Sequence, residues 1–457
     1  MRSTANGLSC LEPLEGRMLL AGSPLGVAER ATSLGLELWI NGSSGSDQIL
    51  ISRSGDMWTI NNGDWRTVRT GRYAALRIDG GAGDDRIEVD GSVTTPAALY
   101  GGAGSDTLIG GAGADRLYGG AGRDLLKGRG GDDVLVSIGG GDRDQLVGGA
   151  GSDSFWTDAA VGESVRDASA GELARGNVHR VASFFNYRYS TGGGFSTAQI
   201  GAELLGENLV DPVTTSTNIT YRNFADRPLF STGGPLADDV SQGYVGDCYF
   251  LATLSAVAKT NPNLIRQSVA DLGDGTYAVR FVQDVGSGPR DVYVRVDADL
   301  PTWSWGALAY ADLGAQGATW VAIMEKAWAF FRYDEGSYES ISGGWMSEVF
   351  TALGRNSEWL WSAQSTDALV SWIEGELAQG KAVTIATQWN QTCSLMIGGH
   401  AYSVDRVSRD GQGNVSVVVR NPWGVDGGTL SGANDGYVTL SAAQLASCFM
   451  AGTSAAV

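Results

Sequence analysis

The chain has 457 residues, which exceeds the usual single-domain range and favours two folded domains with connecting segments. Its 51 acidic and 32 basic side chains give a net charge of -19, and no cluster of Lys and Arg is present, which argues against nucleic acid as the main partner. No apolar run reaches the roughly 18 residues that a transmembrane helix needs, so no membrane span is predicted.

Residues 1–25 form a separate N-terminal segment with the sequence MRSTANGLSCLEPLEGRMLLAG at its start. Its apolar stretch is short, and Glu12 and Glu15 lie directly upstream, unlike in an ordinary secretory signal peptide. The segment resembles the LEPLExRxLL element near the N-terminus of some large bacterial surface and extracellular proteins. The resemblance implies a targeting or sorting role.

Glycine and aspartate recur together in nine-residue units before residue 160. Four consecutive units are GGAGSDTLI from Gly101, GGAGADRLY from Gly110, GGAGRDLLK from Gly119 and GRGGDDVLV from Gly128. Further units begin at Gly42, Gly80, Gly139 and Gly148. The pattern resembles the calcium-binding nonapeptide of the RTX proteins, so we expect residues 26–157 to form a parallel β-roll. A disordered Gly-rich linker is the alternative, but it would not keep apolar residues in phase with aspartate.

Each unit is expected to form one half-turn of the roll, with one apolar side chain pointing inward. These inward residues are Leu108, Leu117, Leu125 or Leu126, Leu135, Leu146 and Phe155. The aspartates then stack in rows and repel one another. Ca²⁺, which takes about six to eight oxygen ligands, would remove this repulsion, so folding of the roll should depend on calcium. The predicted ligands are Asp85, Asp106, Asp115, Asp124, Asp133, Asp144 and Asp153.

Residues 158–224 show no repeat and weak periodicity, and we predict a linker or adaptor region there. The four cysteines of the chain are too few for a disulfide-built scaffold. If Cys248 is catalytic and Cys10 belongs to the N-terminal segment, Cys393 and Cys448 remain. They could pair in an oxidising compartment, or stay as two buried thiols.

A Gly-rich turn precedes an apolar helix in the segment QGYVGDCYFLATLSAVAK, which begins at Gln242. Cys248 falls at the start of that helix, where free N–H groups and partial positive charge favour the thiolate and should lower the cysteine pKa from about 8.5. Gln242 is a candidate to donate its amide, beside the Cys248 N–H, to an oxyanion. A lone cysteine at a helix start is more often a packing residue, so this assignment depends on partners elsewhere in the chain.

The chain contains two histidines, His179 and His400. His179 lies in the poorly patterned linker, whereas His400 follows two glycines and begins the alternating apolar segment HAYSVDRV, which makes it the stronger candidate for a base. Asn421 ends the apolar run VSVVVRNPWG. Its side-chain oxygen can hold the imidazole toward Cys248, and Trp423 could shield that hydrogen bond from water.

The segments QGYVGDC, GHAYSV and RNPWG, in this order, resemble the catalytic core of the calpain-family, papain-like cysteine proteases. The similarity covers about residues 225 to 450 and includes ADDV, VRVDADLP, ATWVAIMEKAWA and GSYESISGG. It implies a multidomain chain whose residues 225–457 form an α+β catalytic domain. It also implies Cys248 as nucleophile, His400 as base, Asn421 as the orienting residue and Gln242 as oxyanion donor.

Two departures from the family pattern bear on calcium and packing. Tyr249 stands where the family commonly has Trp, and only Asp239 matches an acidic position of the kind that binds calcium in animal calpain cores. Direct calcium control of the core is therefore not expected. We expect calcium to act mainly by folding the roll, and an isolated core of residues 225–457 to cleave without it.

These features predict an extracellular or cell-surface cysteine endopeptidase of bacterial type that requires calcium and acts on protein substrates. An alternative from another class is a catalytically silent, calcium-binding surface or adhesion protein with a protease-like domain. A third possibility is a calcium-regulated protease of the cytoplasm, in which Cys393 and Cys448 would stay reduced.

Overall fold

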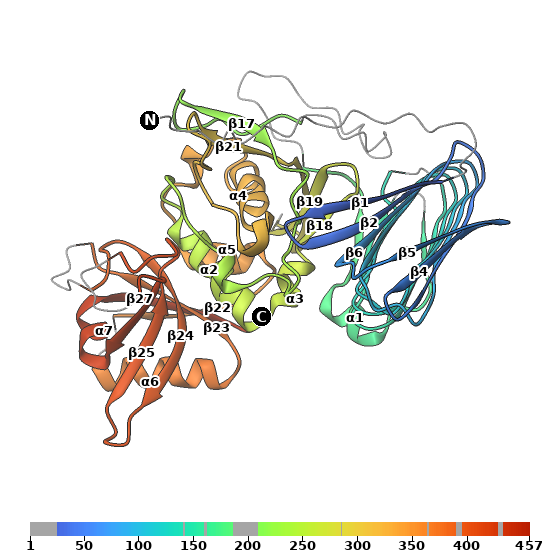
Figure 1. Cartoon of the computed structure of the whole chain (residues 1–457). Coiled ribbons are helices and arrows are strands. Elements are labelled where there is room, and N and C mark those ends of the chain that lie inside the picture. Colours follow the sequence, from blue (N-terminus) through green and yellow to red (C-terminus); the bar gives the residue numbers. More distant parts are fainter. Residues whose placement is uncertain are drawn as a thin grey trace, which may run out of the picture.

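A computed structural model describes residues 25–139, 142–159, 162–185, 209–284, 286–362, 365–389, 395–427 and 433–457. Its N-terminal half is a β-roll and its C-terminal half is an α+β core, as the sequence predicts (Figure 1). Most of the N-terminal segment predicted for residues 1–25 lies outside the described residues, as do Cys10 and Cys393.

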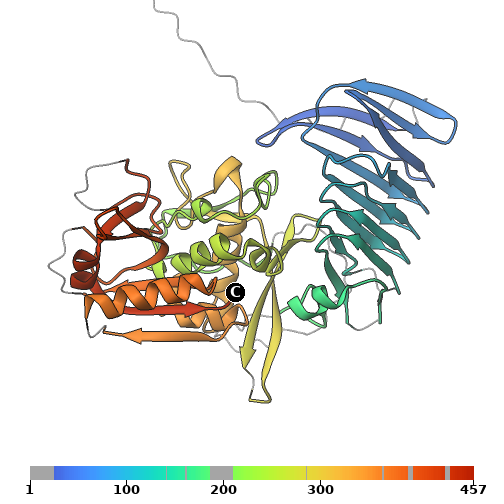
Figure 2. The same cartoon turned by 90° about the horizontal axis from the view of Figure 1, so that it is seen from below.

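The roll consists of two eight-stranded sheets that stack face to face, with their parallel strands arranged like rungs (Figure 2). One sheet has the order β1-β2-β6-β8-β10-β12-β14-β16, and the other has the order β15-β13-β11-β9-β7-β3-β4-β5. The strands of the first sheet are β1 Gly26–Thr32, β2 Gly35–Asn41, β6 Ala75–Ala82, β8 Ala97–Ala103, β10 Arg116–Ala121, β12 Val134–Val136, β14 Ser154–Asp158 and β16 Val178–Val181. Those of the second are β3 Gln48–Ser54, β4 Met57–Asn62, β5 Trp65–Thr70, β7 Arg86–Val89, β9 Thr107–Ile109, β11 Leu125–Gly130, β13 Gln145–Ala150 and β15 Ser164–Val165.

The interior of the roll contains one row of apolar side chains from each sheet. Leu117 pairs in register with Leu135, and Leu135 with Phe155, and all three are fully buried. In the facing sheet Leu126 pairs in register with Leu146. The predicted inward residues are therefore confirmed, and the open choice between Leu125 and Leu126 is settled in favour of Leu126, which is 0% exposed.

The roll extends beyond residue 157, where the sequence placed the start of a linker. Strands β15 and β16 add a last turn, and the short helix α1 (Ala170–Arg175) lies between them. Glu172 takes the place of a repeat aspartate there, because its Oε1 accepts a hydrogen bond of 2.8 Å from the backbone N–H of Asp153. Strand pairing thus continues past residue 158, after the Gly-Asp signature has ended.

The first part of the core is built around the buried helix α2 (Cys248–Thr260). Pro262 separates α2 from α3 (Pro262–Arg266), because the residue before a proline is kept out of the helical conformation. The sheet β18–β19–β20 comprises Val269–Asp271, Thr276–Asp284 and Pro289–Asp297, and β17 (Ile219–Asn223) pairs with β21 (Asp299–Trp303). The remaining helices are α4 (Trp320–Phe331), α5 (Met346–Ala352) and the 3-10 turns Ala237–Asp239, Ala315–Gly317 and Glu339–Ile341.

The second part of the core is a six-stranded antiparallel sheet of order β22-β27-β23-β24-β25-β26. Its strands are β22 Ser357–Trp361, β27 Phe449–Ala455, β23 Ala382–Thr387, β24 Ala401–Arg409, β25 Val415–Arg420 and β26 Tyr437–Ser441. Apolar residues of α6 (Thr366–Ala378) and α7 (Ala442–Cys448) pack in one cluster with those of the sheet. Cys448 is disulfide-bonded, and its partner lies outside the described residues.

The roll and the core share an apolar interface. Tyr118 and Trp156 of the roll lie in one buried cluster with Leu272 and Tyr293 of the core. Gly273 permits this approach, because a Cβ at its position would lie 2.8 Å from the ring of Tyr118. The roll therefore covers an apolar face of the core. Within the described residues, none of the helices has the length and apolar character needed to cross a membrane.

Candidate active site

Cys248 is the first residue of α2, as expected from the sequence. The helix buries residues 249–258 in the core and so fixes the direction of its N-terminal end. Tyr249, which stands where a tryptophan is common, accepts a hydrogen bond of 3.0 Å from Trp328 Nε1 and donates one of 3.1 Å to the carbonyl oxygen of Ile341. Tyr249 thus anchors the first turn of the helix.

His400 and Asn421 come together because they occupy adjoining ends of two paired strands. His400 directly precedes β24 and Asn421 directly follows β25, and Ser403 pairs with Arg420 in the antiparallel register. The His400 Nε2 and Asn421 Oδ1 atoms are 2.9 Å apart. Both residues are buried, with His400 6% and Asn421 0% exposed.

The hydrogen bonds of Asn421 decide which nitrogen of His400 carries the proton. Asn421 Oδ1 accepts a second hydrogen bond, of 3.0 Å, from the backbone N–H of Trp423, and its Nδ2 donates to the carbonyl oxygen of Asp426. Because Oδ1 is an acceptor, His400 Nε2 must be the donor, and Nδ1 of the neutral ring is the free base. The Trp423 ring lies beside the imidazole, with 4.9 Å between the centroids and an angle of 54° between the planes.

Several hydrogen bonds join the two parts of the core across the candidate site. The backbone N–H of Gln242 donates to the carbonyl oxygen of Pro422 at 2.7 Å, and Arg420 Nη2 donates to the carbonyl oxygen of Val240 at 2.7 Å. Lys259 forms an ion pair with Asp405. These contacts hold the helix that begins with Cys248 against the strands that carry His400 and Asn421.

Gln242 lies on the loop that leads into α2. Its Nε2 donates one hydrogen bond of 2.7 Å to the carbonyl oxygen of Val245, which leaves the second N–H of the amide group. Its Oε1 is buried without a hydrogen-bond partner among the described residues. The amide is therefore fixed next to the start of the helix, where it also lowers the pKa of Asp247 through a side-chain hydrogen bond.

The ionisation of the two central groups differs from the sequence expectation. Burial raises the pKa of the Cys248 thiol to about 11, more than the backbone N–H of Ala401 lowers it, and the charge of Asp247 acts in the same direction as burial. Burial also lowers the pKa of His400 to about 4, against the effect of its bond to Asn421. The expected lowering of the thiol pKa is therefore not met. The resting pair is a neutral thiol beside a neutral imidazole.

A buried pair of carboxyl groups lies behind the nucleophile, and sequence reasoning missed it. Asp247 is fully buried, and burial raises its pKa by more than side-chain hydrogen bonds with Glu325 and Gln242 lower it. Glu325, on α4, is also buried and accepts from the backbone N–H of Ala311 at 3.0 Å. Burial raises the pKa of Asp247 to about 7 and that of Glu325 well above its usual range, and each carboxyl group acts on the other. Two such groups at hydrogen-bond range share one proton at neutral pH.

Glu325 and Lys326 are adjacent charged residues of α4 that engage different partners. Both are buried, and Lys326 forms ion pairs with Asp211 and Asp297 at 2.5 Å each, leaving Glu325 to face Asp247. The helix is apolar on all sides, so its charged residues turn inward as well. A signal was present in the sequence: an almost entirely apolar stretch around two charges predicts a buried helix.

His179, the other histidine of the chain, has a structural role. It lies in β16 of the roll, fully buried, with its ring stacked on Trp156 at 4.1 Å between centroids and its Nε2 3.1 Å from Gln267 Oε1. Burial lowers its pKa to about 4. His179 packs the roll against the core and takes no part in the candidate site.

The seven predicted calcium ligands form two buried ladders, one along each edge of the roll. Each aspartate accepts, through Oδ1, a hydrogen bond from a backbone N–H one turn earlier; Asp115 N to Asp133 Oδ1, at 2.8 Å, is one example. The second oxygen is buried and unpartnered, among the described residues, in six of the seven, namely Asp85, Asp106, Asp124, Asp133, Asp144 and Asp153. In the seventh, Asp115, Oδ2 accepts from the Gly111 N–H.

The oxygens around the ladders suit a hard cation. A Cβ placed on Gly110 would meet Asp115 Oδ2 at 2.4 Å and the carbonyl oxygen of Gly128 at 2.6 Å, so carboxylate and main-chain oxygens converge there. Within the described ranges, no three His, Cys, Asp or Glu side chains gather at one point. Any calcium ion would thus draw on main-chain carbonyls as well as on carboxylates.

Asp239, the one residue of the core that matches a calcium-binding position of the family, is occupied by structural hydrogen bonds. Its Oδ1 accepts from the backbone N–H of Ala315 at 2.8 Å, and its Oδ2 accepts from Trp320 Nε1 at 2.7 Å. The carboxylate is fully buried. It holds the loop before α4 against the segment that leads to Cys248.

Comparison with known proteins places both halves of the chain. Residues 218–434 match the calpain family cysteine protease, and residues 77–91, 100–135 and 138–160 match the RTX calcium-binding nonapeptide repeat. The calpain-2 catalytic subunit of Gallus gallus is 32% identical over 213 residues, which are 43% of this chain and 29% of that protein. That of Bos taurus is 31% identical over 211 residues, 44% of this chain and 30% of that protein.

A plant relative shows a similar degree of likeness. The calpain-type cysteine protease ADL1 of Oryza sativa subsp. japonica is 30% identical over 217 residues, 44% of this chain and 10% of that protein. The chain thus spans less than a third of the length of these relatives. It contains a cysteine protease domain of the calpain family, homologous to calpain catalytic subunits and preceded by RTX calcium-binding repeats.

Proposed function

We propose that the chain is a calpain-type endopeptidase in which Cys248 attacks a peptide carbonyl and His400 transfers the proton. The observation that supports this most directly is the 2.9 Å hydrogen bond between His400 and Asn421, which leaves Nδ1 as the free base. The Ala401 N–H, next to His400, acts on the Cys248 thiol, so base and nucleophile are neighbours. A nucleophile, a base and an orienting amide are the groups that acyl transfer through cysteine needs.

The proton path follows from this tautomer. The thiol proton of Cys248 passes to His400 Nδ1 as Sγ bonds to the substrate carbonyl carbon. The resulting oxyanion accepts from the Cys248 N–H and from the side-chain amide of Gln242. Protonated His400 then gives its Nδ1 proton to the leaving amine as the C–N bond breaks, which leaves an acyl-thioester. His400 next deprotonates a water molecule, whose attack releases the acid and restores the thiol.

The roll is proposed to bind Ca²⁺ through the seven ladder aspartates together with glycine carbonyl oxygens. The buried, unpartnered Oδ2 atoms support this, because such oxygens are costly unless a proton or a cation compensates them. RTX repeats are typical of secreted bacterial proteins, and we accordingly propose an extracellular or cell-surface location and protein substrates. A disulfide at Cys448 supports an oxidising compartment over a cytoplasmic one.

A thiol-directed probe tests the proposed nucleophile. The full chain with calcium, treated with a peptidyl epoxide, should be modified at Cys248 alone, and peptide mapping by mass spectrometry identifies the site. Cys248→Ala should remain unmodified. Failure of the folded chain to react, together with an absence of cleavage of an unfolded protein substrate, would favour the catalytically silent adhesion protein.

Replacing Asp247 by Asn should lower the pKa of the Cys248 thiol. Asparagine keeps the shape of the side chain but removes the charge next to the sulfur, and the remaining acid of the pair, Glu325, lies on another helix. The pH dependence of alkylation by iodoacetamide measures this pKa. Glu325→Gln is the matched control. It also removes one acid of the pair, but the acid that is further from the sulfur, so it should shift the curve less. An unchanged or raised thiol pKa in Asp247→Asn would contradict the argument.

A further inference from the structure

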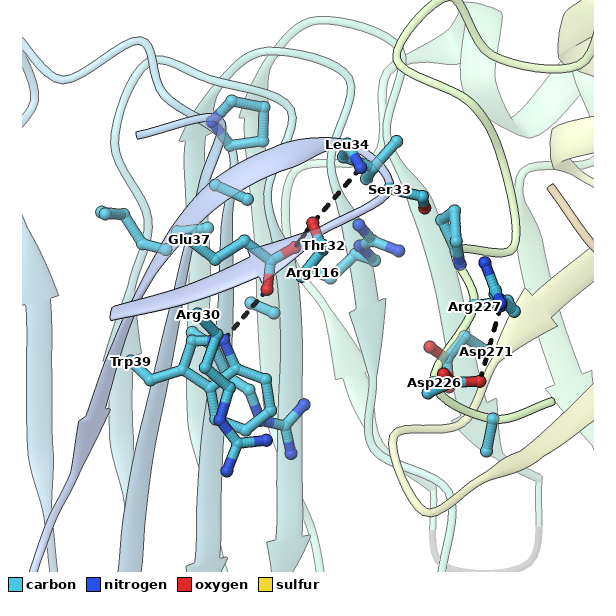
Figure 3. A pocket seen from close by; sticks show the side chains of 18 of the residues that line it. Arg30, Thr32, Ser33, Leu34, Glu37, Trp39, Arg116, Asp226, Arg227 and Asp271 are labelled. Atoms are coloured by element: carbon cyan, nitrogen blue, oxygen red, sulfur yellow. Dashed lines mark hydrogen bonds and ion pairs between the residues drawn. The ribbon is translucent and has the colours of Figure 1, made fainter. Parts of the chain in front are cut away.

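A cavity of about 450 Å³ lies between the outer face of the roll and the core. Figure 3 shows Arg30, Trp39 and Arg116 on the roll side, and Arg227 and Asp271 on the core side. Four arginines line the cavity, although the chain as a whole carries a net charge of -19. A concentration of guanidinium groups in so acidic a protein is the observation that needs an explanation.

Aromatic rings hold two of these arginines in place. Arg30 lies over the Trp39 ring at 3.8 Å and Arg77 over the same ring at 4.9 Å, and Arg77 also lies 3.9 Å from the centroid of Tyr100. Tyr100 in turn stacks on Tyr118. Stacking occupies the faces of a guanidinium group and leaves its N–H edge free for hydrogen bonds.

Arg116 stands on the same row of the sheet, two strands from Arg77. Both are in register with Ala98, whose small side chain lies between them and lines the cavity. Within the part of the chain that the structure describes, neither Arg30, Arg77 nor Arg116 forms an ion pair. Arg77 donates only to the hydroxyl of Tyr100. The three guanidinium groups thus face the space without a carboxylate in ion-pair range.

Three acidic residues also line the cavity, Glu37, Asp226 and Asp271. Glu37 accepts from Trp39 Nε1 at 3.0 Å, and Asp226 lies 3.8 Å from Arg227 (Figure 3). Asp271 accepts from the backbone N–H of Gly273 and attracts Arg116 from beyond ion-pair range. These carboxylates keep their negative charge, so the four arginines of the lining exceed the three carboxylates by one positive charge.

We propose that this cavity binds a small organic or inorganic anion that carries more than one carboxylate or phosphate group. The N–H edges of Arg30, Arg77 and Arg116 would hold its oxygens, since guanidinium groups bind carboxylate and phosphate in bidentate fashion. The size of the space fits a small molecule and excludes a folded partner. Because roll and core each supply a wall, binding also requires the calcium-folded roll and favours its docked position.

Isothermal titration calorimetry of the full chain tests the proposal and separates the two anion classes. With calcium present, citrate represents a polycarboxylate and pyrophosphate a polyphosphate, and at least one should bind. Arg116→Gln and Arg30→Gln should each weaken that binding about 10- to 100-fold, the loss expected for a charge-assisted hydrogen bond. Asp271→Asn, which removes the facing negative charge, should tighten it.

The controls keep the test independent of folding and of proteolysis. Arg72→Gln removes the same charge from an exposed arginine outside the cavity and should leave affinity unchanged. Arg30 is itself exposed, so its variant should melt like the parent chain. The proposal fails if neither anion binds at millimolar concentration, if Arg72→Gln weakens binding as much as Arg116→Gln, or if Asp271→Asn weakens it. None of these readouts requires peptidase activity.

Discussion

Replacing either Cys248 or His400 by Ala should reduce kcat/KM on an unfolded protein substrate by about 10⁴-fold or more. The sulfur forms the bond to the substrate, and His400 Nδ1 is the free base that the bond to Asn421 orients. Because the two groups act as one unit, the double variant should be no slower than the worse of the single variants. Initial rates of substrate cleavage with calcium present, for all three variants, measure this.

The second histidine provides the matched control. His179→Gln alters a residue that packs roll against core, so it should lower the melting temperature and leave turnover per folded molecule unchanged. Two results would contradict the proposed chemistry: cleavage by Cys248→Ala above the background of the buffer, or a loss in His179→Gln as large as that in His400→Ala. Losses that multiplied in the double variant would mean that the two residues act separately.

The repeat and the catalytic motifs were predictable because each is encoded locally. A period of nine residues fixes which side chain of each half-turn points inward, and the structure settles the one choice left open, between Leu125 and Leu126. The His400 and Asn421 assignments came from single residues at the ends of apolar runs. Strand pairing then brings these ends together.

What the sequence did not reveal depends on contacts between distant segments. Asp247 and Glu325 lie 78 positions apart, and nothing local indicates that burial forces them to share a proton. The thiol pKa also depends on contacts with distant segments. The helix end favours the thiolate, but burial of the sulfur raises the pKa by more. Glu172 completes the aspartate ladder from a helix, where no repeat signature exists.

The docking of roll on core changes what calcium can be expected to do. Leu272, Ala278 and Tyr293 of the core are buried in one cluster with Tyr118 and Trp156. An isolated core of residues 225–457 would expose this face to water. Its calcium-free activity, which the sequence leads us to expect, stays a prediction, and the full chain is the better material for testing it. Loss of calcium should weaken the core as well as the roll.

The effect of pH on the stability of the roll should reverse when calcium is removed. In the metal-free chain burial raises the pKa of Asp133 to about 9, of Asp115 and Asp124 to about 7, and of the other four ladder aspartates, Asp85, Asp106, Asp144 and Asp153, to about 6. The ordinary pKa of an aspartate is 3.8, so the folded roll binds more protons than the unfolded chain. Its stability is fully present below that value and is lost as pH rises through about 6 to 9.

Calcium opposes this trend because it binds the ionised carboxylates and competes with protons for them. Thermal melting followed by circular dichroism at roughly pH 5 and roughly pH 8 should therefore give opposite orders: more stable at the lower pH with chelator, and more stable at the higher pH with calcium. Asp133→Asn keeps the acceptor for the Asp115 N–H but removes the most strongly shifted acid, so it should flatten the metal-free pH dependence and weaken the calcium effect. Asp64→Asn, at an exposed position, should change neither curve. The same order of stability with and without calcium would mean that the ladders do not exchange protons for the metal.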